Sequence, residues 1–275
     1  MYTIIDSLED LDFLNKELLD KPYLGVDTEF RRTNKYNMKL ALLQVNDSEE
    51  TYLIDTLCIK NPCESASFLF SDSVVKIFHS CKEDLEAVYS WTNNHMENIF
   101  DTQLANSFLQ DNYSISYQSL VEQELQINLD KKETRSNWIR RPLSDAQLKY
   151  AALDVEYLIH LYLIQFNLLK SSKKLNWLQQ DINRLINTTF NPDLSSANLE
   201  RTISKNEEFE LLKELNEIVI RIASEKKINS TMLFSKKSQK DFLRLIFHKG
   251  IDFALNSITD WRSSLIRKDL EKLLK

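Results

Sequence analysis

The chain has 275 residues, of which 43% are hydrophobic and 28% charged, and its formal net charge is −6 at pH 7. This length and composition predict a folded protein with one α/β domain and a smaller second domain. The presence of only two glycines, Gly25 and Gly250, excludes both a glycine-rich phosphate loop and a dinucleotide-binding turn. The negative charge gives no support to nucleic-acid binding, which would have to rest on local basic patches.

Neither an export signal nor a membrane span is visible in the sequence. The first residues are acidic rather than basic, and no stretch approaches the ~20 apolar residues that a membrane-spanning helix needs. Cys58, Cys63 and Cys81 have no C-x-x-C spacing, which argues against a disulfide framework and a thiolate zinc site. We therefore expect a cytoplasmic protein.

The first two thirds of the chain alternate short β-branched runs with amphipathic stretches, a pattern typical of a sheet covered by helices. Strands are predicted at residues 2–5, 23–29, 39–46, 51–55 and 74–79, and helices at 9–19, 64–69, 82–89, 102–108, 118–125, 144–169 and 175–186. The polar segment 47–50 suits a hairpin, so the sheet is expected to be mixed. Ser144, followed three residues later by Gln147, marks the start of the long helix.

The last third of the chain has a different pattern. Residues 188–206 are polar, contain Pro192 and have no sustained period, which indicates a linker. From residue 207 onward the apolar residues recur only at helical spacing. The predicted organisation is therefore a first domain at 1–187, a linker at 188–206 and an all-α domain at 207–275.

Two acids end the second predicted strand. Asp27 and Glu29 are two residues apart, and because strand side chains alternate, both project to the same face and could share a metal ion. An isolated pair of this kind is more often simply solvated. The same D-x-E pattern recurs at residues 84–86 and 154–156, but there it falls in predicted helices, where residues two apart point in different directions.

Tyr150 and Asp154 are four residues apart in the long predicted helix, so both side chains lie on one face. A Tyr and an Asp at this spacing often occur together by chance. The order of the motifs along the chain is more informative. A D-x-E pair on a strand comes first, then Asp84 opens a helix, and the Tyr-Asp pair follows in a late helix. This ordered set resembles the tyrosine branch of the DEDD exonuclease superfamily, since Lys149 stands where the histidine branch has its histidine.

The resemblance to ribonuclease D extends over residues 2–177, in segments such as GVDTEFRRTNKY, FHSCKEDLEAV and TRSNWIRRPLSDAQLKYAALDVEYL. It implies a ribonuclease H-like mixed sheet with flanking helices. It also implies that residues 207–275 form one helical domain of the helicase-and-ribonuclease-D type (HRDC-like). The residues implied for the active site are the metal-site acids Asp27, Glu29, Asp84 and Asp154, with Tyr150 beside the attacking water.

Four carboxylates without a cysteine or histidine cluster suit two Mg²⁺ or Mn²⁺ ions rather than zinc. Asp27 is expected to bridge the two ions. Glu29 and Asp154 would complete the ion that activates water, and Asp84 would hold the second ion. The ordinary pKa of a tyrosine, near ~10, makes Tyr150 a poor base at neutral pH, so we expect it to orient the water.

Substrate contacts are expected beside these motifs, although each candidate has a simpler interpretation as a solvated or packed residue. The candidates are Phe30, Arg31, His79, Arg135 and Arg141. The expected function is a 3′-to-5′ exoribonuclease that releases nucleoside 5′-monophosphates from single-stranded RNA 3′ ends, in tRNA precursors and other small stable RNAs. A DNA 3′-end exonuclease with the same chemistry and a non-catalytic RNA-binding protein are the alternatives.

Overall fold

The computed structural model describes residues 2–34, 37–110, 114–129, 136–191 and 199–274. The chain divides into two compact units, Met1–Gln103 with Ile115–Asn167 (unit 1) and Leu104–Ser114 with Leu168–Lys275 (unit 2). The division falls inside α3 (Thr102–Leu109) and α6 (Leu158–Ser171), so each of these helices contributes to both units. No described helix has both the length and the apolar character needed to span a bilayer.

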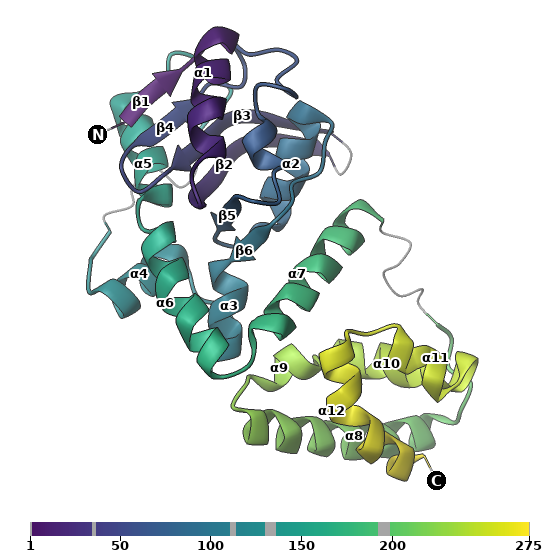
Figure 1. Cartoon of the computed structure of the whole chain (residues 1–275). Helices are drawn as coiled ribbons and strands as arrows, with labels where there is room; N and C mark the ends of the chain where they lie inside the picture. The colour runs from purple at the N-terminus through teal and green to yellow at the C-terminus, as the bar shows by residue number, and fades with distance from the viewer. Residues whose placement is uncertain (1, 35–36, 111–113, 130–135, 192–198, 275) are drawn as a thin grey trace. The chain divides into compact units, whose positions relative to one another are not determined.

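Unit 1 is built on a six-stranded mixed sheet with the strand order β1-β4-β3-β2-β5-β6 (Figure 1). The pairs β2·β3 and β3·β4 are antiparallel, and the other neighbouring pairs are parallel. The strands are β1 (Tyr2–Ile5), β2 (Tyr23–Asn34), β3 (Asn37–Asn46), β4 (Thr51–Ile54), β5 (Val75–Phe78) and β6 (Ile99–Asp101). The mixed α/β fold predicted from the sequence is confirmed, and each of the five predicted strands is present.

Unit 1 differs from the sequence-based prediction in three places up to β6. Strand β6 was not predicted, because three residues are too few to show an alternating pattern. Strand β2 continues beyond Glu29 to Asn34, since its outer half pairs with the beginning of β3. The helix predicted at 64–69 is only a 3-10 turn, η1 (Ser67–Leu69).

Two helices of unit 1 contact the central strands β2 and β3, and these are α2 (Lys82–Thr92) and α5 (Asp145–Glu156). Thr28 of β2 bonds to Asp84 of α2, whereas Asp27 and Glu29 lie beside Asp154 of α5. Because successive strand side chains alternate, α2 and α5 meet β2 on opposite faces. Unit 1 also contains α1 (Leu8–Leu19) and α4 (Tyr117–Leu125).

The single helix predicted at 144–169 is wrong, since the structure divides it at Tyr157 into α5 and α6. The hydroxyl of Tyr117 accepts a hydrogen bond from the Tyr157 N–H at 3.0 Å and donates one to the Leu153 carbonyl at 3.2 Å. A side chain inserted between these backbone groups interrupts the helix. The residue responsible lies outside the helix, so the periodicity of the helix itself gives no sign of the break.

Unit 2 is helical. Trp261 is 3% exposed, its ring stacks on that of Trp177 with centroids 4.8 Å apart, and its N–H donates to Asp181 at 3.0 Å. Trp261 therefore packs in the core of this unit. In this division α7 (Leu175–Phe190) belongs to the same unit as the later helices. The domain limits expected from the sequence, at residues 187 and 207, would instead place α7 with the first domain, and they stay a prediction. The helices are α7 (Leu175–Phe190), α8 (Lys205–Lys226), α9 (Ser230–Leu233), α10 (Lys236–Lys249), α11 (Ile251–Asn256) and α12 (Asp260–Leu273).

Gly25 allows β2 and the α5–α6 break to approach each other closely. A β-carbon at this position would lie 2.9 Å from the Val155 carbonyl oxygen and 3.1 Å from the Leu158 Cβ. We predict that Gly25→Ala lowers the free energy of unfolding by about 1–3 kcal/mol, because backbone must move to relieve the clash. Urea denaturation measures the loss, and Lys16→Ala on the exposed face of α1 should stay within about 0.5 kcal/mol of wild type. A Gly25→Ala protein as stable as wild type would contradict the close approach.

Candidate active site and metal centre

Three carboxylates from two elements converge in unit 1. Asp27 and Glu29 of β2 and Asp154 of α5 each offer an oxygen atom within 4.8 Å of the others. The first two side chains are half-buried, and Asp154 is 8% exposed. This carboxylate cluster brings together three of the four acids predicted from the sequence. Among the residues that the structure describes, Asp84 is not a member of the cluster.

The first turn of α5 fixes which face of the helix meets β2. The Ser144 hydroxyl accepts a bond from the Gln147 N–H at 3.2 Å, and the Gln147 side chain accepts one from the Ser144 N–H at 3.0 Å. This is the capping box predicted from the sequence. With the start of the helix fixed, the spacing of four residues puts Tyr150 and Asp154 on the same face.

Tyr150 lies one helical turn before Asp154, on the same face of α5. Burial raises the pKa of Tyr150 well above its ordinary value, and the negative charges of Asp154, Glu29 and Asp27 raise it further. The phenol is therefore protonated at neutral pH. Its position beside the carboxylate cluster makes it a donor of hydrogen bonds rather than an acceptor of protons.

Asp84 meets β2 through a different contact. Its carboxylate accepts a hydrogen bond from the Thr28 hydroxyl, and Thr28 points to the face of β2 opposite to Asp27 and Glu29. Burial raises the pKa of Asp84 to about 7, against the opposing effect of the bond from Thr28. A role for Asp84 as a metal ligand stays a prediction.

A buried amide lies beside the carboxylate cluster. Gln44 of β3 is directly opposite Asp27, and directly opposed residues of an antiparallel pair project to the same face. Gln44 is fully buried, and neither of its amide atoms has a hydrogen-bond partner among the described residues. Such a group costs about 1–3 kcal/mol. Three carboxylate oxygens within reach of one another, next to a polar group retained at this cost, fit a hard divalent cation.

The candidate substrate contacts are dispersed. Phe30 is half-buried and Arg31 exposed, both on β2 directly after Glu29. His79 has both ring nitrogens bonded within unit 1, at 2.9 and 3.0 Å, as expected of a packed residue at a strand end. Arg135 lies outside the described residues. Contact of these residues with a substrate stays a prediction.

Arg141 is engaged within the protein. Its guanidinium forms two hydrogen bonds to Asp55, one of them 2.7 Å long, and donates to the carbonyls of Trp138 at 2.6 Å and Ala41 at 2.8 Å. The ring of Trp138 in turn packs 6.1 Å from that of Tyr150, measured between centroids. Arg141 therefore has a structural role next to α5. Neither Asp55 nor Trp138 was predicted from the sequence, because an ion pair across 86 positions leaves no local pattern.

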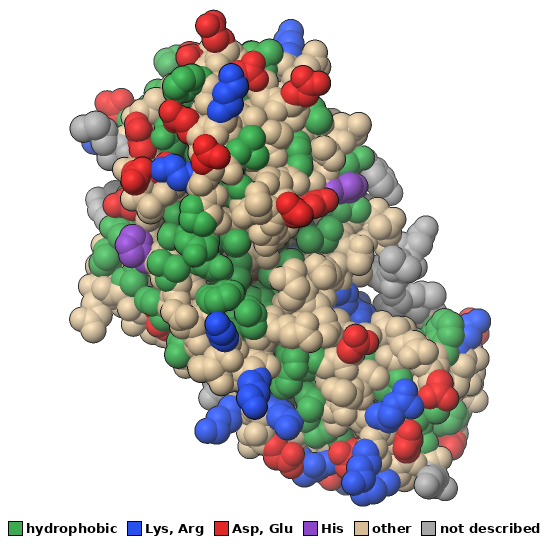
Figure 2. Space-filling view, viewed as in Figure 1, with side chains coloured by type: hydrophobic (Ala, Val, Ile, Leu, Met, Phe, Trp, Pro, Cys, Tyr) green, Lys and Arg blue, Asp and Glu red, His purple; other side chains and the backbone are tan. Residues whose placement is uncertain are grey.

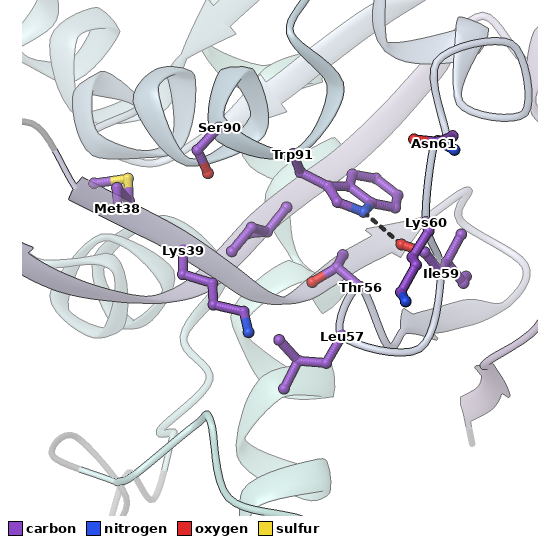
Figure 3. A pocket seen from close by; sticks show the side chains of 10 residues that line it. Met38, Lys39, Thr56, Leu57, Ile59, Lys60, Asn61, Ser90 and Trp91 are labelled. Atoms are coloured by element: carbon purple, nitrogen blue, oxygen red, sulfur yellow. Dashed lines mark hydrogen bonds between the residues drawn. The ribbon is translucent and has the colours of Figure 1, made fainter.

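A pocket of about 390 Å³ lies elsewhere in unit 1, between β3, α2 and the segment after β4 (Figure 3). The indole N–H of Trp91 donates to the Ile59 carbonyl at 3.1 Å, and the side chains of Lys39 and Lys60 lie at the pocket's edge. Neither Tyr150 nor any of the four predicted acids lines it. The pocket is therefore separate from the carboxylate cluster.

Comparison with known proteins matches residues 2–169 to the family model of 3′-5′ exonucleases. Ribonuclease D of Pseudomonas paraeruginosa is 40% identical over 166 residues, which are 60% of this chain and 44% of that protein. The crystal structure of Escherichia coli RNase D, an exoribonuclease involved in structured RNA processing, has a TM-score of 0.66 and 23% identity, covering 100% of this chain and 73% of its own. Brucella melitensis NrnC bound to pGG has a TM-score of 0.61 and 21% identity, covering 74% and 100%. The chain spans about half the length of the curated relatives it matches.

The contacts of Arg141 predict a loss of stability on its removal. Arg141→Ala should lower the free energy of unfolding by about 1–3 kcal/mol, because the largely buried Asp55 carboxylate loses its partner. Denaturation in urea without RNA measures this, and Arg140→Ala, at the exposed neighbouring position, should stay within about 0.5 kcal/mol of wild type. If both variants are as stable as wild type, the ion pair has no structural role and Arg141 becomes a substrate-contact candidate again.

Proposed function

The chain belongs to the 3′-5′ exonuclease family, and we propose that it is a metal-dependent 3′-to-5′ exoribonuclease of the ribonuclease D kind. The observation that carries this proposal is the convergence of Asp27, Glu29 and Asp154 within 4.8 Å, with Tyr150 on the same face of α5 as Asp154. Support also comes from the family model that matches residues 2–169 and from the relatives that bear the name ribonuclease D.

Asp27, Glu29 and Asp154 would hold divalent cations, Mg²⁺ or Mn²⁺, with Asp84 as the fourth acid. Oxygen donors without thiolate or imidazole favour these hard ions over zinc. When bound, the cations would supply positive charge that favours ionisation of the attacking water and offsets charge on the phosphate oxygens. The protein's contribution is to hold the carboxylates close together despite their mutual repulsion.

The reaction joins a water oxygen to the phosphorus of the terminal nucleotide. The bond from that phosphorus to the 3′ oxygen of the preceding nucleotide breaks, and this oxygen takes up a proton, so the product is a nucleoside 5′-monophosphate. Tyr150 keeps its own proton, because burial and the adjacent carboxylates raise its pKa. Its hydroxyl orients the water beside Asp154 and does not deprotonate it.

The proposed substrates are single-stranded 3′ ends of tRNA precursors and other small stable RNAs. Figure 2 shows Lys and Arg side chains gathered on the visible face of unit 2. Residues 207–275 would form the HRDC-like domain after a linker at 188–206 and an exonuclease domain at 1–187. Exposed lysines of this domain could contact the phosphate backbone, and they are Lys226, Lys227, Lys236, Lys237 and Lys240.

The exonuclease proposal is tested with 5′-labelled single-stranded RNA and the matching DNA, in Mn²⁺, Mg²⁺ or EDTA. We expect a ladder that shortens from the 3′ end, needs a divalent metal and is slower by about 10²-fold or more in Asp154→Ala. Glu156→Ala removes an exposed acid from the same helix and should behave as wild type.

The substrates that are shortened distinguish the proposal from its two alternatives. Faster shortening of RNA supports the exoribonuclease, and faster shortening of DNA supports the DNA 3′-end exonuclease. If a folded protein shortens neither strand with either metal, the remaining reading is a non-catalytic RNA-binding protein.

The raised pKa of Tyr150 predicts how activity depends on pH. Because the phenol is protonated at neutral pH in the wild type, any rise of kcat with pH must come from another group. Tyr150→Phe should therefore lower kcat, by up to about 10²-fold through poorer alignment, and leave the shape of the pH profile unchanged. Profiles of kcat from about pH 6 to about pH 9 measure this. A rise that is lost only in Tyr150→Phe would make Tyr150 a general base.

A further inference from the structure

The hydroxyl of Tyr117 occupies a place normally taken by a backbone hydrogen bond. In an uninterrupted α-helix the Tyr157 N–H would donate to the Leu153 carbonyl four residues earlier. Here the hydroxyl lies between the two groups, accepting from the Tyr157 N–H at 3.0 Å and donating to the Leu153 carbonyl at 3.2 Å. One atom thus satisfies both backbone groups and separates α5 from α6.

This contact is adjacent to the carboxylate cluster. The Leu153 carbonyl belongs to the peptide bond that joins Leu153 to Asp154, and α5 ends two residues later at Glu156. Asp154 has an oxygen within 4.8 Å of Asp27 and Glu29, on a different element. The direction of the last turn of α5 therefore sets the distance from Asp154 to the two acids of β2.

The position of Tyr117 is itself fixed. The residue is 6% exposed and begins α4, which is capped by the side chain of Ser116. The ring of His79 packs edge-on against its ring with centroids 5.7 Å apart. His79 is held by the Thr102 hydroxyl at 2.9 Å and by the Ile115 carbonyl at 3.0 Å. The hydroxyl is thus held by packing on several sides.

The hydroxyl also keeps its proton. Burial raises the pKa of Tyr117 well above its ordinary value, and the charges of Asp154 and Asp27 raise it further. A protonated phenol can donate to the Leu153 carbonyl and accept from the Tyr157 N–H at the same time. Phenylalanine would retain the ring and its packing but could do neither.

We propose that Tyr117 is a positioning residue for Asp154, and that its hydroxyl holds the α5–α6 break in the geometry that brings Asp154 to the acids of β2. This inference rests on the proposed function, since it assigns Asp154 to a metal-binding site. It also gives His79 a place in the site, as support for Tyr117 rather than as a substrate contact.

Tyr162 provides a matched control. It lies in α6 and is 6% exposed, like Tyr117, and its ring packs against Tyr23 and Phe100 with centroids 5.2 and 4.8 Å apart. Its hydroxyl has no hydrogen-bond partner among the residues that the structure describes. Tyr162→Phe therefore removes a hydroxyl from an equally buried residue of the same unit without touching the helix break.

The experiment compares Mn²⁺ binding, by isothermal titration calorimetry, and RNA hydrolysis in wild type, Tyr117→Phe and Tyr162→Phe. Circular dichroism first verifies that each protein is folded at the assay temperature. Tyr117→Phe should raise the dissociation constant for Mn²⁺ by ~10–100-fold, as for other residues that orient a ligand. It should lower kcat with little change in KM for RNA, while Tyr162→Phe keeps wild-type values.

If the wild-type protein binds Mn²⁺ and shortens RNA, two outcomes would overturn the positioning role of Tyr117 and leave the proposed function standing. One is a Tyr117→Phe protein that matches Tyr162→Phe in both measurements. The other is unchanged Mn²⁺ binding with a raised KM, which would make Tyr117 a substrate contact. If the wild type does not bind Mn²⁺ at all, the proposed metal site fails and the positioning role fails with it.

Discussion

The approach of α5 to β2 is the constraint on which the rest of the site depends. Three carboxylates within 4.8 Å repel one another, and β2 and α5 each have to be fixed before their side chains can share so small a space. Gly25 permits the approach, because a β-carbon there would lie 2.9 Å from the Val155 carbonyl oxygen. The central position of β2, paired with β3 on one side and β5 on the other, gives the cluster a rigid base.

Polar side chains from distant parts of the chain hold α5 at both ends. Before its first turn, Arg141 binds Asp55 and the Ala41 carbonyl, which ties the segment leading into α5 to the central strands. After its last turn, Tyr117 bridges the break to α6. Tyr150 and Asp154 lie between these two attachments. The helix is therefore located by hydrogen bonds at its ends as well as by its buried face.

The site keeps polar groups in surroundings that disfavour charge. Burial raises the pKa values of Tyr150 and Asp84, and the amide of Gln44 is buried with no described partner. The unpaired amide of Gln44 lowers the stability of the fold relative to an apolar replacement. Buried polar groups are a feature of sites selected for chemistry, and here they lie along the same stretch of β2.

The sequence by itself determined the acids, their order and the local geometry of each pair. Alternation along β2 put Asp27 and Glu29 on one face, and the capping box at Ser144 fixed Tyr150 and Asp154 on one face of α5, because both patterns depend only on neighbours in the chain. Only the tertiary structure decided which groups meet across the fold. It bonded Asp84 to Thr28, engaged Arg141 with Asp55, and broke the long helix with Tyr117. These contacts join residues from 36 to 86 positions apart, and no periodicity in a single segment records a partner at that distance.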